Sequence, residues 1–283
     1  MINVSVLITT LNEAENLPRC LAALKDFDEI IVIDSGSADG TRESAQSFGV
    51  RVENFNWNGD YPKKRQWCLD NLDIKHDFIF FVDGDEEVTT ALVYEIKALD
   101  FKADGYFIKG QYVWDDIKLK HGLKNSKLVL FNRHKIEFPV VDDLDIDGMG
   151  EIEGHYQPVL KNAGLLLSLD APMLHHAYED QDGWERRHKN YAEWEAEMIR
   201  RDAYPKDPDL FRQILKVLFR RLPFRGALAF YHSYFINLGF LDGAAGYGFA
   251  RSRMEYYRLV SRALKSSKAL DTTSLERKPR SAL

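Results

Sequence analysis

The sequence has few cysteines and no long apolar run. Only Cys20 and Cys68 occur in 283 residues, both in predicted helices, which argues against a disulfide framework and favours reduced thiols in a cytosolic setting. The longest uncharged apolar stretch near the C-terminus, residues 226–241, falls short of the roughly 20 residues that span a membrane. No basic segment precedes an apolar one at the start, so we expect no signal peptide.

Acidic and basic residues are divided unevenly along the chain. Residues 211–265 contain ten Lys or Arg against two acids, a net charge of +8, and the tail after them adds +2. Because the whole chain carries −6, the first 210 residues carry −16. This split indicates an acidic part followed by a basic part that suits an anionic surface. A nucleic-acid partner is not expected, because no nucleic-acid motif is present and the acidic part would repel phosphate.

Strand-like and helix-like segments alternate over the first hundred residues. This alternation predicts crossover units and a parallel sheet, which places the chain in the α/β class. Ligands of such sheets bind at the carboxyl ends of the strands. From Gly105 onward, Tyr106–Trp114 and Lys127–Arg133 are predicted as longer antiparallel strands, and Gly183–Arg201 as a helix with an aromatic packing face. The predicted strands of the first half are Val4–Thr10, Glu29–Asp34, Val50–Phe55 and Phe78–Val82, and the helices are Leu17–Lys25 (with Asn16 as its cap), Asp39–Phe48, Tyr61–Leu72 and Thr90–Leu99.

The segment FIFFVDGDEE, residues 78–87, combines a buried strand with an acidic turn. Carboxylates at the end of a buried strand are costly unless something positive meets them. Asp83 and Asp85, on either side of Gly84, could place oxygen ligands on one Mg²⁺ or Mn²⁺ ion. An acidic surface turn is the simpler alternative for this motif taken alone. However, the first and second strands also end in polar, acidic segments, residues 9–13 and 34–40, so three strand ends together favour a ligand site.

Three motifs in order, VSVLITTLNEAENL, EIIVIDSGSADGT and FVDGDEEV, resemble the inverting glycosyltransferases of family 2. The resemblance implies a GT-A fold, a Rossmann-like mostly parallel sheet flanked by helices, here followed by an α-helical C-terminal extension. EIEGHYQP, residues 151–158, the LHH step at residues 174–176 and RRHKNYAEWEA, residues 186–196, also look like a subgroup that modifies lipopolysaccharide core or other surface polysaccharide.

The resemblance assigns candidate roles at the strand ends. Thr9, Leu11 and Glu13 would cup the nucleoside, and Asp34 would accept a hydrogen bond from uracil. Many relatives have two acids at that position, whereas this chain has Asp34-Ser35. Further residues assigned to the nucleotide sugar are Arg65, Asp83 and Gly84, with Asp83 and Asp85 as metal ligands. Asp39 either joins the site or caps the next helix, and Lys63 and Lys64 either reach the diphosphate or face solvent.

The resemblance also calls for a carboxylate base from the second half of the chain, which would deprotonate an acceptor hydroxyl. Glu153 is the first candidate, with Glu151, Asp142 and Asp143 as rivals. A further metal ligand could come from the histidines at 155, 175 and 176, although core or surface positions are commoner for histidine. The aromatic residues Trp114, Tyr156 and Trp184 could stack on a sugar or simply pack in the core.

Residues 210–225 alternate apolar and cationic positions with roughly helical spacing. This pattern is typical of a helix in a membrane interface, the alternative being a helical subdomain packed on the catalytic core. We therefore predict a catalytic domain over 1–205, a basic amphipathic helical region over 206–265 that associates peripherally with an anionic membrane, and a disordered tail over 266–283. The exposed aromatic residues of the second region also make self-association an expectation.

Taken together, these features predict a metal-dependent hexosyltransferase at the cytoplasmic face of the cell membrane. It would move a sugar, with inversion, from a nucleotide-sugar donor, expected to be UDP-linked, to a saccharide or lipid-linked acceptor in surface polysaccharide or lipopolysaccharide synthesis. One alternative keeps the fold and transfers to a polyprenyl phosphate, which needs no strong base. Another is a non-catalytic protein that binds nucleotide sugars at the membrane.

Overall fold

The computed structural model describes residues 1–153, 156–176, 181–205 and 210–275. The chain forms two compact units. Unit 1 comprises Met1–Val140 and Glu151–Glu179, and unit 2 comprises Val141–Gly150 and Asp180–Leu283. The structural division therefore places the helix after residue 180 with the C-terminal helices, whereas the predicted boundary at residue 205 follows the sequence motifs. That predicted boundary stays a prediction.

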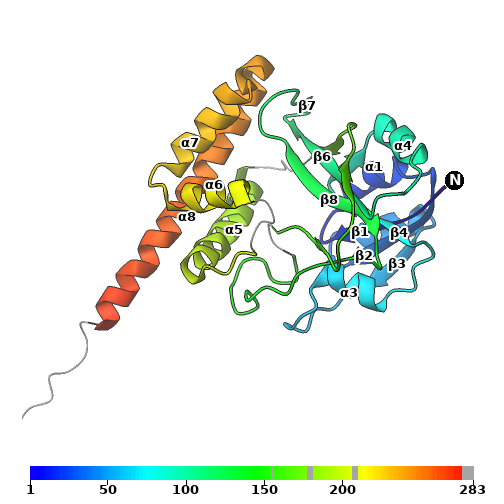
Figure 1. Ribbon diagram of the computed structural model, residues 1–283, viewed down its shortest axis with the longest axis horizontal. Coiled ribbons are helices and arrows are strands. Elements are labelled where there is room, and N and C mark those ends of the chain that lie inside the picture. The colour runs from blue at the N-terminus through cyan, green and yellow to red at the C-terminus, as the bar shows by residue number, and fades with distance from the viewer. Residues whose placement is uncertain (154–155, 177–180, 206–209, 276–283) are drawn as a thin grey trace, which may run out of the picture. The chain divides into compact units, whose positions relative to one another are not determined.

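Unit 1 begins with the expected alternation of strands and helices (Figure 1). Strands β1 to β4 pair in parallel in the order β3-β2-β1-β4, and α3 lies on the opposite side of these strands from α1 and α4. The α/β fold with a Rossmann-like parallel half is thus confirmed. The elements are β1 Ile2–Thr10, α1 Leu17–Ala22, β2 Phe27–Asp34, α2 Thr41–Ser47, β3 Arg51–Asn54, α3 Lys64–Asn71, β4 Phe78–Asp83 and α4 Thr90–Lys97.

The central strands are buried because their sequences are apolar on both faces. Val6, Leu7 and Ile8 of β1 and Phe80 of β4 have no exposed surface. Continuous apolar runs are what a parallel strand covered by helices on both faces requires. The strand ends are therefore the first points at which polar side chains can reach solvent or a ligand.

The second half of unit 1 extends the same sheet with mixed pairing. The predicted pair is confirmed as β6, Gly105–Trp114, antiparallel to β8, Asn125–Asn132, and β8 is antiparallel to β4. The remaining strands have only two or three residues, too few for a periodic signal. They are β5 Glu86–Val88, β7 Ile117–Lys118, β9 Ile136–Glu137, β10 Val159–Leu160, β11 Leu166–Ser168 and β12 Met173–His175.

Asn16 is the N-cap residue of α1, as predicted, but its side chain does not cap the helix. Asn16 precedes α1 but makes no capping hydrogen bond to its backbone. Instead its side-chain amide donates to Glu13 Oε2 at 2.9 Å, and its Oδ1 accepts from Arg19. The carboxylate of Glu13 thus competes with the helix end for the Asn16 side chain, which sequence spacing alone does not show.

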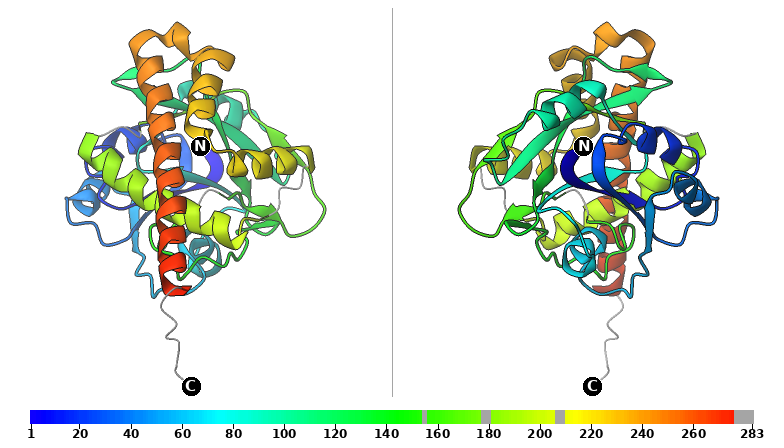
Figure 2. Two further views of the ribbon diagram at one scale, coloured as in Figure 1. Left: turned by 90° about the vertical axis from the view of Figure 1, so that its left-hand side faces the viewer. Right: turned by 90° about the vertical axis from the view of Figure 1, so that its right-hand side faces the viewer.

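Unit 2 is helical. It contains α5 Gln181–Arg201, α6 Leu210–Arg221, α7 Arg225–Tyr231, a π-helical turn η1 at His232–Ile236, a 3-10 turn η2 at Gly239–Asp242 and α8 Gly243–Leu275. Helix α7 runs alongside the first part of α8 (Figures 1 and 2). Ala192 and Ala196 of α5 form a small buried cluster with Val260 of α8. The C-terminal helices are therefore the packing partners of α5.

The predicted aromatic stripe on α5 is a packing face. Trp184, Trp194 and Met198 are buried, and Trp184 stacks on His188 with ring centroids 4.1 Å apart. No helix in the described part of the chain is long and apolar enough to cross a membrane. Helix α8 continues to Leu275 and so includes the first ten residues of the predicted disordered tail; residues 276–283 lie outside the described residues.

Candidate active site

The carboxyl ends of β1 and β4 lie side by side because these strands pair in parallel register. Thr9 is opposite Asp83, and the Thr9 hydroxyl donates to Asp83 Oδ1 at 2.9 Å. At the other side of β1, Thr10 is opposite Asp34 of β2. Three of the predicted strand-end residues, Thr9, Asp34 and Asp83, therefore do come to one edge of the sheet.

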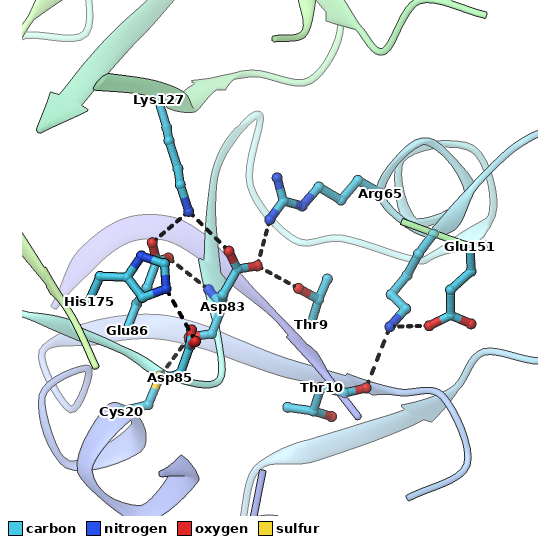
Figure 3. Close-up of polar contacts among 11 residues, drawn as sticks. Thr9, Thr10, Cys20, Arg65, Asp83, Asp85, Glu86, Lys127, Glu151 and His175 are labelled. Atoms are coloured by element: carbon cyan, nitrogen blue, oxygen red, sulfur yellow. Dashed lines mark hydrogen bonds and ion pairs between the residues drawn. The ribbon is translucent and has the colours of Figure 1, made fainter. Parts of the chain in front are cut away.

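Two cations from different elements meet the Asp83 carboxylate (Figure 3). Arg65 on α3 donates to Oδ1 at 2.5 Å, and Lys127 on β8 donates to Oδ2 at 3.1 Å. Burial raises the pKa of Asp83, but the two cations outweigh it and hold that pKa well below its usual range. Asp83 is therefore an anion whose charge is balanced within the protein, and the predicted place of Arg65 in the site fits this geometry.

Lys127 and Glu86 are site residues that the sequence reading did not assign. Lys127 Nζ lies 2.8 Å from Glu86 Oε1, and Glu86 Oε2 accepts from the Asp83 backbone N–H at 2.9 Å. Burial lowers the pKa of Lys127, yet Glu86 and Asp83 raise it above its ordinary value. Glu86 lies in the acidic motif, but the sequence predicted no role for it. No sequence pattern predicted a site role for Lys127, because its contact with Asp83 and Glu86 depends on the pairing of β8 with β4.

Asp85 faces a histidine from a distant part of the chain. His175 in β12 lies beside β5, and its Nε2 is 3.2 Å from Asp85 Oδ2. Burial raises the pKa of Asp85 and lowers that of His175, but the attraction between them reverses both shifts. A carboxylate oxygen suits both Mg²⁺ and Mn²⁺, whereas an imidazole nitrogen suits a transition metal, so this pair of ligands favours Mn²⁺ over Mg²⁺.

The other histidines are placed differently. His176 Nε2 contacts Glu87 Oε2 at 3.0 Å, and His155 lies outside the described residues. Among the described residues, no group of three or more His, Cys, Asp or Glu side chains is arranged to hold a metal ion. Asp83, the second predicted metal ligand, already contacts Arg65 and Lys127. The protein side of a metal site here would therefore consist mainly of Asp85 and His175.

Asp34 is fully buried and holds the loop that follows β2. Its Oδ2 accepts from the backbone N–H groups of Gly36 and Ser37 at 3.1 and 3.0 Å, and its Oδ1 accepts from the hydroxyls of Ser37 and Thr10. Asp39 acts similarly at the start of α2, where its Oδ1 accepts from the Thr41 backbone. Its Oδ2 accepts from the Ala14 backbone N–H at 3.0 Å, and the N-cap residue of α2 is Gly40. Asp39 thus connects the segment after β1 with the start of α2, and both of its predicted roles stay predictions.

Leu11, Glu13 and Gly84 line the remaining strand-end positions. Leu11 is half exposed, with 49% of its surface accessible. A Cβ at Gly84 would lie 2.8 Å from Glu13 Cγ and 3.3 Å from Thr10 Cγ2, too close for a side chain. The glycine between the two aspartates therefore lets the turn after β4 approach the turn after β1.

Glu153 is buried at the N-terminus of α3. Its Oε1 accepts from the Gln66 backbone N–H at 2.9 Å, and burial raises the pKa of its carboxyl group although Arg65 partly opposes this. Its neighbour Glu151 pairs with Lys64 at 2.6 Å. Glu153 and Arg65 thus meet at the same end of α3, and Glu153 also satisfies a free helix N–H.

The other candidate base, Asp143, belongs to unit 2. It is buried, and its Oδ2 accepts from the indole N–H of Trp194 at 3.1 Å. Asp142, next to it, is exposed. Of the candidate aromatic platforms, Tyr156 and Trp184 are buried, which fits packing better than stacking on a sugar.

Residues 5–135, just under half of the chain, match the sequence model of glycosyl transferase family 2. This segment contains most of β1, all of β2 to β4, the Asp83–Asp85 turn, Arg65 and Lys127. The chain therefore carries a glycosyl transferase family 2 domain. The expected resemblance is confirmed for this segment.

Named glycosyltransferases are similar to about a third of this chain. The lipopolysaccharide core biosynthesis glycosyltransferase LpsC of Rhizobium meliloti is 33% identical over 93 residues, which are 31% of this chain and 33% of that protein. Glycosyltransferase AglE of Haloferax volcanii is 34% identical over 91 residues, 29% of this chain and 30% of that protein. The matched part thus spans about a third of each relative.

The solved structure of Staphylococcus aureus TarS, residues 1–349, covers 93% of this chain and 91% of its own. Its sequence identity is 16% and its TM-score is 0.42, values too low to carry an argument about function. The family assignment therefore depends on the sequence match.

Proposed function

We propose that this protein is a metal-dependent inverting glycosyltransferase. It moves a sugar, in our proposal a hexose, from a nucleotide-sugar donor to a saccharide or lipid-linked acceptor in surface polysaccharide or lipopolysaccharide synthesis. The family 2 match and the relationship to LpsC support the reaction class. The observation that carries the proposal is the charge cluster at the carboxyl ends of β1 and β4, where Asp83, Asp85 and Glu86 face Arg65, Lys127 and His175.

The cluster has the charges that a nucleoside diphosphate requires. Arg65 and Lys127 are partly buried cations that share Asp83 as a partner, and Lys127 also pairs with Glu86. Their guanidinium and ammonium groups also suit phosphate oxygens. Thr9, near the end of β1, and Leu11 and Glu13 in the segment after it lie beside this cluster, where a nucleoside would sit. We assign the nucleotide sugar to these residues together with Gly84 and Asp34.

Asp85 and His175 are the residues that would hold a Mg²⁺ or Mn²⁺ ion, with Asp83 beside them. When bound, such an ion supplies charge neutralisation to the departing diphosphate. The remaining coordination would come from donor phosphates and water, as is usual for Mg²⁺. His175 serves this role only when its imidazole is neutral, so the proton it shares with Asp85 must leave first.

We propose UDP as the nucleotide on the resemblance at Asp34. Its carboxylate already accepts three hydrogen bonds from the loop after β2 and one from Thr10 of β1. Asp34 would therefore affect base selection through the shape of residues 35–40 as much as by direct contact. Asp34→Asn should therefore weaken UDP binding by loosening this loop. A variant that binds UDP as tightly as the wild type would remove Asp34 from the donor site.

For the base we propose Glu153, with Asp143 as the alternative. The raised pKa of Glu153 suits a group that must accept a proton, and Arg65 links it to the Asp83 cluster. Its hydrogen bond to Gln66 N–H can be kept by glutamine. Glu153→Gln should therefore lower turnover by orders of magnitude with little effect on donor binding.

The engagement of Glu153 with α3 also favours one second candidate, transfer to a polyprenyl phosphate. A phosphate acceptor is already an anion and needs no strong base. In that case Glu153→Gln would leave turnover near the wild-type rate, whereas Asp85→Asn would still abolish it. The same pair of variants therefore separates the two acceptor classes.

The direct test is release of nucleoside diphosphate from UDP-, GDP- and CDP-sugars, with Mn²⁺ or with a chelator. We expect metal-dependent release from one donor, loss of it in Asp85→Asn, and retention in the matched control Asp100→Asn, an exposed aspartate paired with Lys102. The anomeric configuration of the product, read by NMR, tests inversion. A folded wild type that releases nothing from any donor, with a range of saccharide and lipid-phosphate acceptors, would contradict the proposal.

We further propose that the protein acts at the cytoplasmic face of the membrane, attached peripherally through unit 2. Support comes from half-exposed apolar side chains that alternate with cations in the sequence. They are Ile214, Leu215 and Leu218 of α6 and Leu222, which follows that helix. Vesicle binding tests this attachment independently of catalysis.

A further inference from the structure

Unit 2 contains a pocket of about 360 Å³ between the start of α7 and the middle of α8. Its α7 side is apolar and its α8 side is cationic. Gly226 forms part of its wall at the contact of the two helices, because a Cβ there would lie 2.8 Å from the Met254 carbonyl oxygen. The pocket is lined by Pro223, Phe224, Gly226, Ala227, Arg258, Ser261, Arg262 and Lys265.

Three cations line the pocket and no carboxylate does. Arg258, Arg262 and Lys265 are spaced by four and three residues, so they lie on one face of α8. Arg258 pairs with Glu255 at 2.6 Å, whereas neither Arg262 nor Lys265 has an ion-pair partner among the described residues. The Ser261 hydroxyl donates to the Tyr257 carbonyl oxygen at 2.7 Å, so the cations are the groups that face an anion. They suit an anion with more than one negative charge, such as a terminal phosphate.

The other side of the pocket identifies the kind of molecule that carries the phosphate. Phe224 is 75% exposed although it lines the pocket, and its neighbours Leu222 and Leu228 are 43% and 41% exposed. Exposed apolar side chains beside a cationic pocket match a lipid, which presents a charged headgroup next to its hydrocarbon region. A free phosphate would gain nothing from Phe224.

We propose that this pocket binds the terminal phosphate of a membrane lipid, with Arg262 and Lys265 contacting the phosphate and Phe224 entering the lipid interface. The inference rests on the proposed peripheral attachment and adds to it a defined site and a headgroup class. It is separate from the donor site, so nucleotide-sugar turnover and lipid selectivity can fail independently.

The test is sedimentation of the full chain with vesicles of equal surface charge. One set contains phosphatidic acid, whose phosphate is terminal, and the other contains phosphatidylglycerol, whose phosphate is a diester. We expect tighter binding to phosphatidic acid. Arg262→Gln and Lys265→Gln should each weaken that binding by about fivefold and remove the preference, since each cation near an anionic surface contributes about this much.

The matched control is Arg251→Gln, an exposed arginine of the same helix outside the pocket. It removes the same charge and should weaken binding to both vesicle types while keeping the preference. Phe224→Ser should weaken vesicle binding without changing the headgroup preference. The circular dichroism of each variant should match that of the wild type.

Three results would overturn the inference. Equal binding to the two vesicle types would mean that binding depends only on the surface charge of the vesicle and not on the headgroup. If glycerol 3-phosphate abolished vesicle binding at a concentration similar to that of phosphatidic acid, the pocket would bind free phosphate esters and not specifically lipids. Absence of vesicle binding together with a concentration-dependent dimer, measured by analytical ultracentrifugation, would mean that a second copy covers this face.

Discussion

The two proposed sites, one in each unit, place their charges in opposite ways. In the unit 1 site, Glu86 is buried and contacts partly buried charges at the end of β4, namely Asp83, Arg65 and Lys127. In unit 2, cations such as Arg262 and Lys265 line a surface pocket beside exposed apolar side chains. Buried, mutually compensated charges are suited to chemistry in a low-dielectric site, whereas exposed cations with apolar neighbours are suited to a surface partner.

Asp85→Asn should have the largest effect and should affect unit 1 alone. The change removes the anionic ligand paired with His175 and with it several kcal/mol of transition-state stabilisation. Metal-dependent turnover should therefore fall on the order of a thousandfold or more. Turnover assays measure this, and lipid selectivity should be unchanged. A wild-type rate would remove Asp85 from the site.

Lys127→Met tests whether the buried charges of unit 1 depend on one another. Glu86 would lose its cation in a buried position, and we expect a destabilisation of about 3 to 5 kcal/mol. Urea unfolding measures the change. The double variant Lys127→Met with Glu86→Gln should recover much of the loss, and Lys102→Met, at an exposed pair, should change nothing measurable. A Lys127→Met protein as stable as the wild type would contradict the claim that Lys127 balances the charge of Glu86.

His188 tests unit 2 through pH. Burial lowers its pKa to about 4, below the 6.5 of an unfolded histidine, so the unfolded chain binds more protons between these values. Stability from the neutral imidazole is therefore present above pH 6.5 and is lost as pH falls toward 4, by about 3 kcal/mol. The pH dependence of urea unfolding should flatten in His188→Gln. If the pH dependence of the unfolding free energy were the same in His188→Gln as in the wild type, it would come from other titratable groups.

Gly84→Ala should have a smaller effect, confined to the two strand-end turns. The new methyl group would crowd Glu13 and Thr10, at a cost of about 1 to 3 kcal/mol in unfolding free energy and with weaker nucleotide binding. Gly110→Ala is the control, because its Cβ would meet the Asn125 carbonyl oxygen at an ordinary 3.4 Å. Equal effects of both changes would mean that the close approach at Gly84 has no role.

The N-terminal half of the fold was predictable because its signals are local. Buried strands such as FIFFVD and the acidic residues after them appear as runs of neighbouring residues, and parallel pairing brings their ends together. The partners of those acids were not predictable in the same way. Lys127 reaches Asp83 through an antiparallel pairing, and His175 reaches Asp85 through a three-residue strand, and neither contact leaves a local pattern.

The same distinction explains the helical region. The composition of residues 211–265 indicated a basic, amphipathic segment, but the break of residues 226–241 into α7 and two short turns depends on Leu238, which has a left-handed φ of 58°. Removal of all residues after 209 would strip α5 of its packing partner α8, so single substitutions are the better test of membrane binding.

The most direct test of the central claim is calorimetric titration of the full chain with UDP, GDP and CDP, each with and without Mn²⁺, alongside the Asp85→Asn variant. The proposed site predicts that one nucleotide, expected to be UDP, binds in a Mn²⁺-dependent manner to the wild type and that the variant loses this dependence. Binding of no nucleotide by the folded wild type, or Mn²⁺-dependent binding that survives in Asp85→Asn, would contradict it.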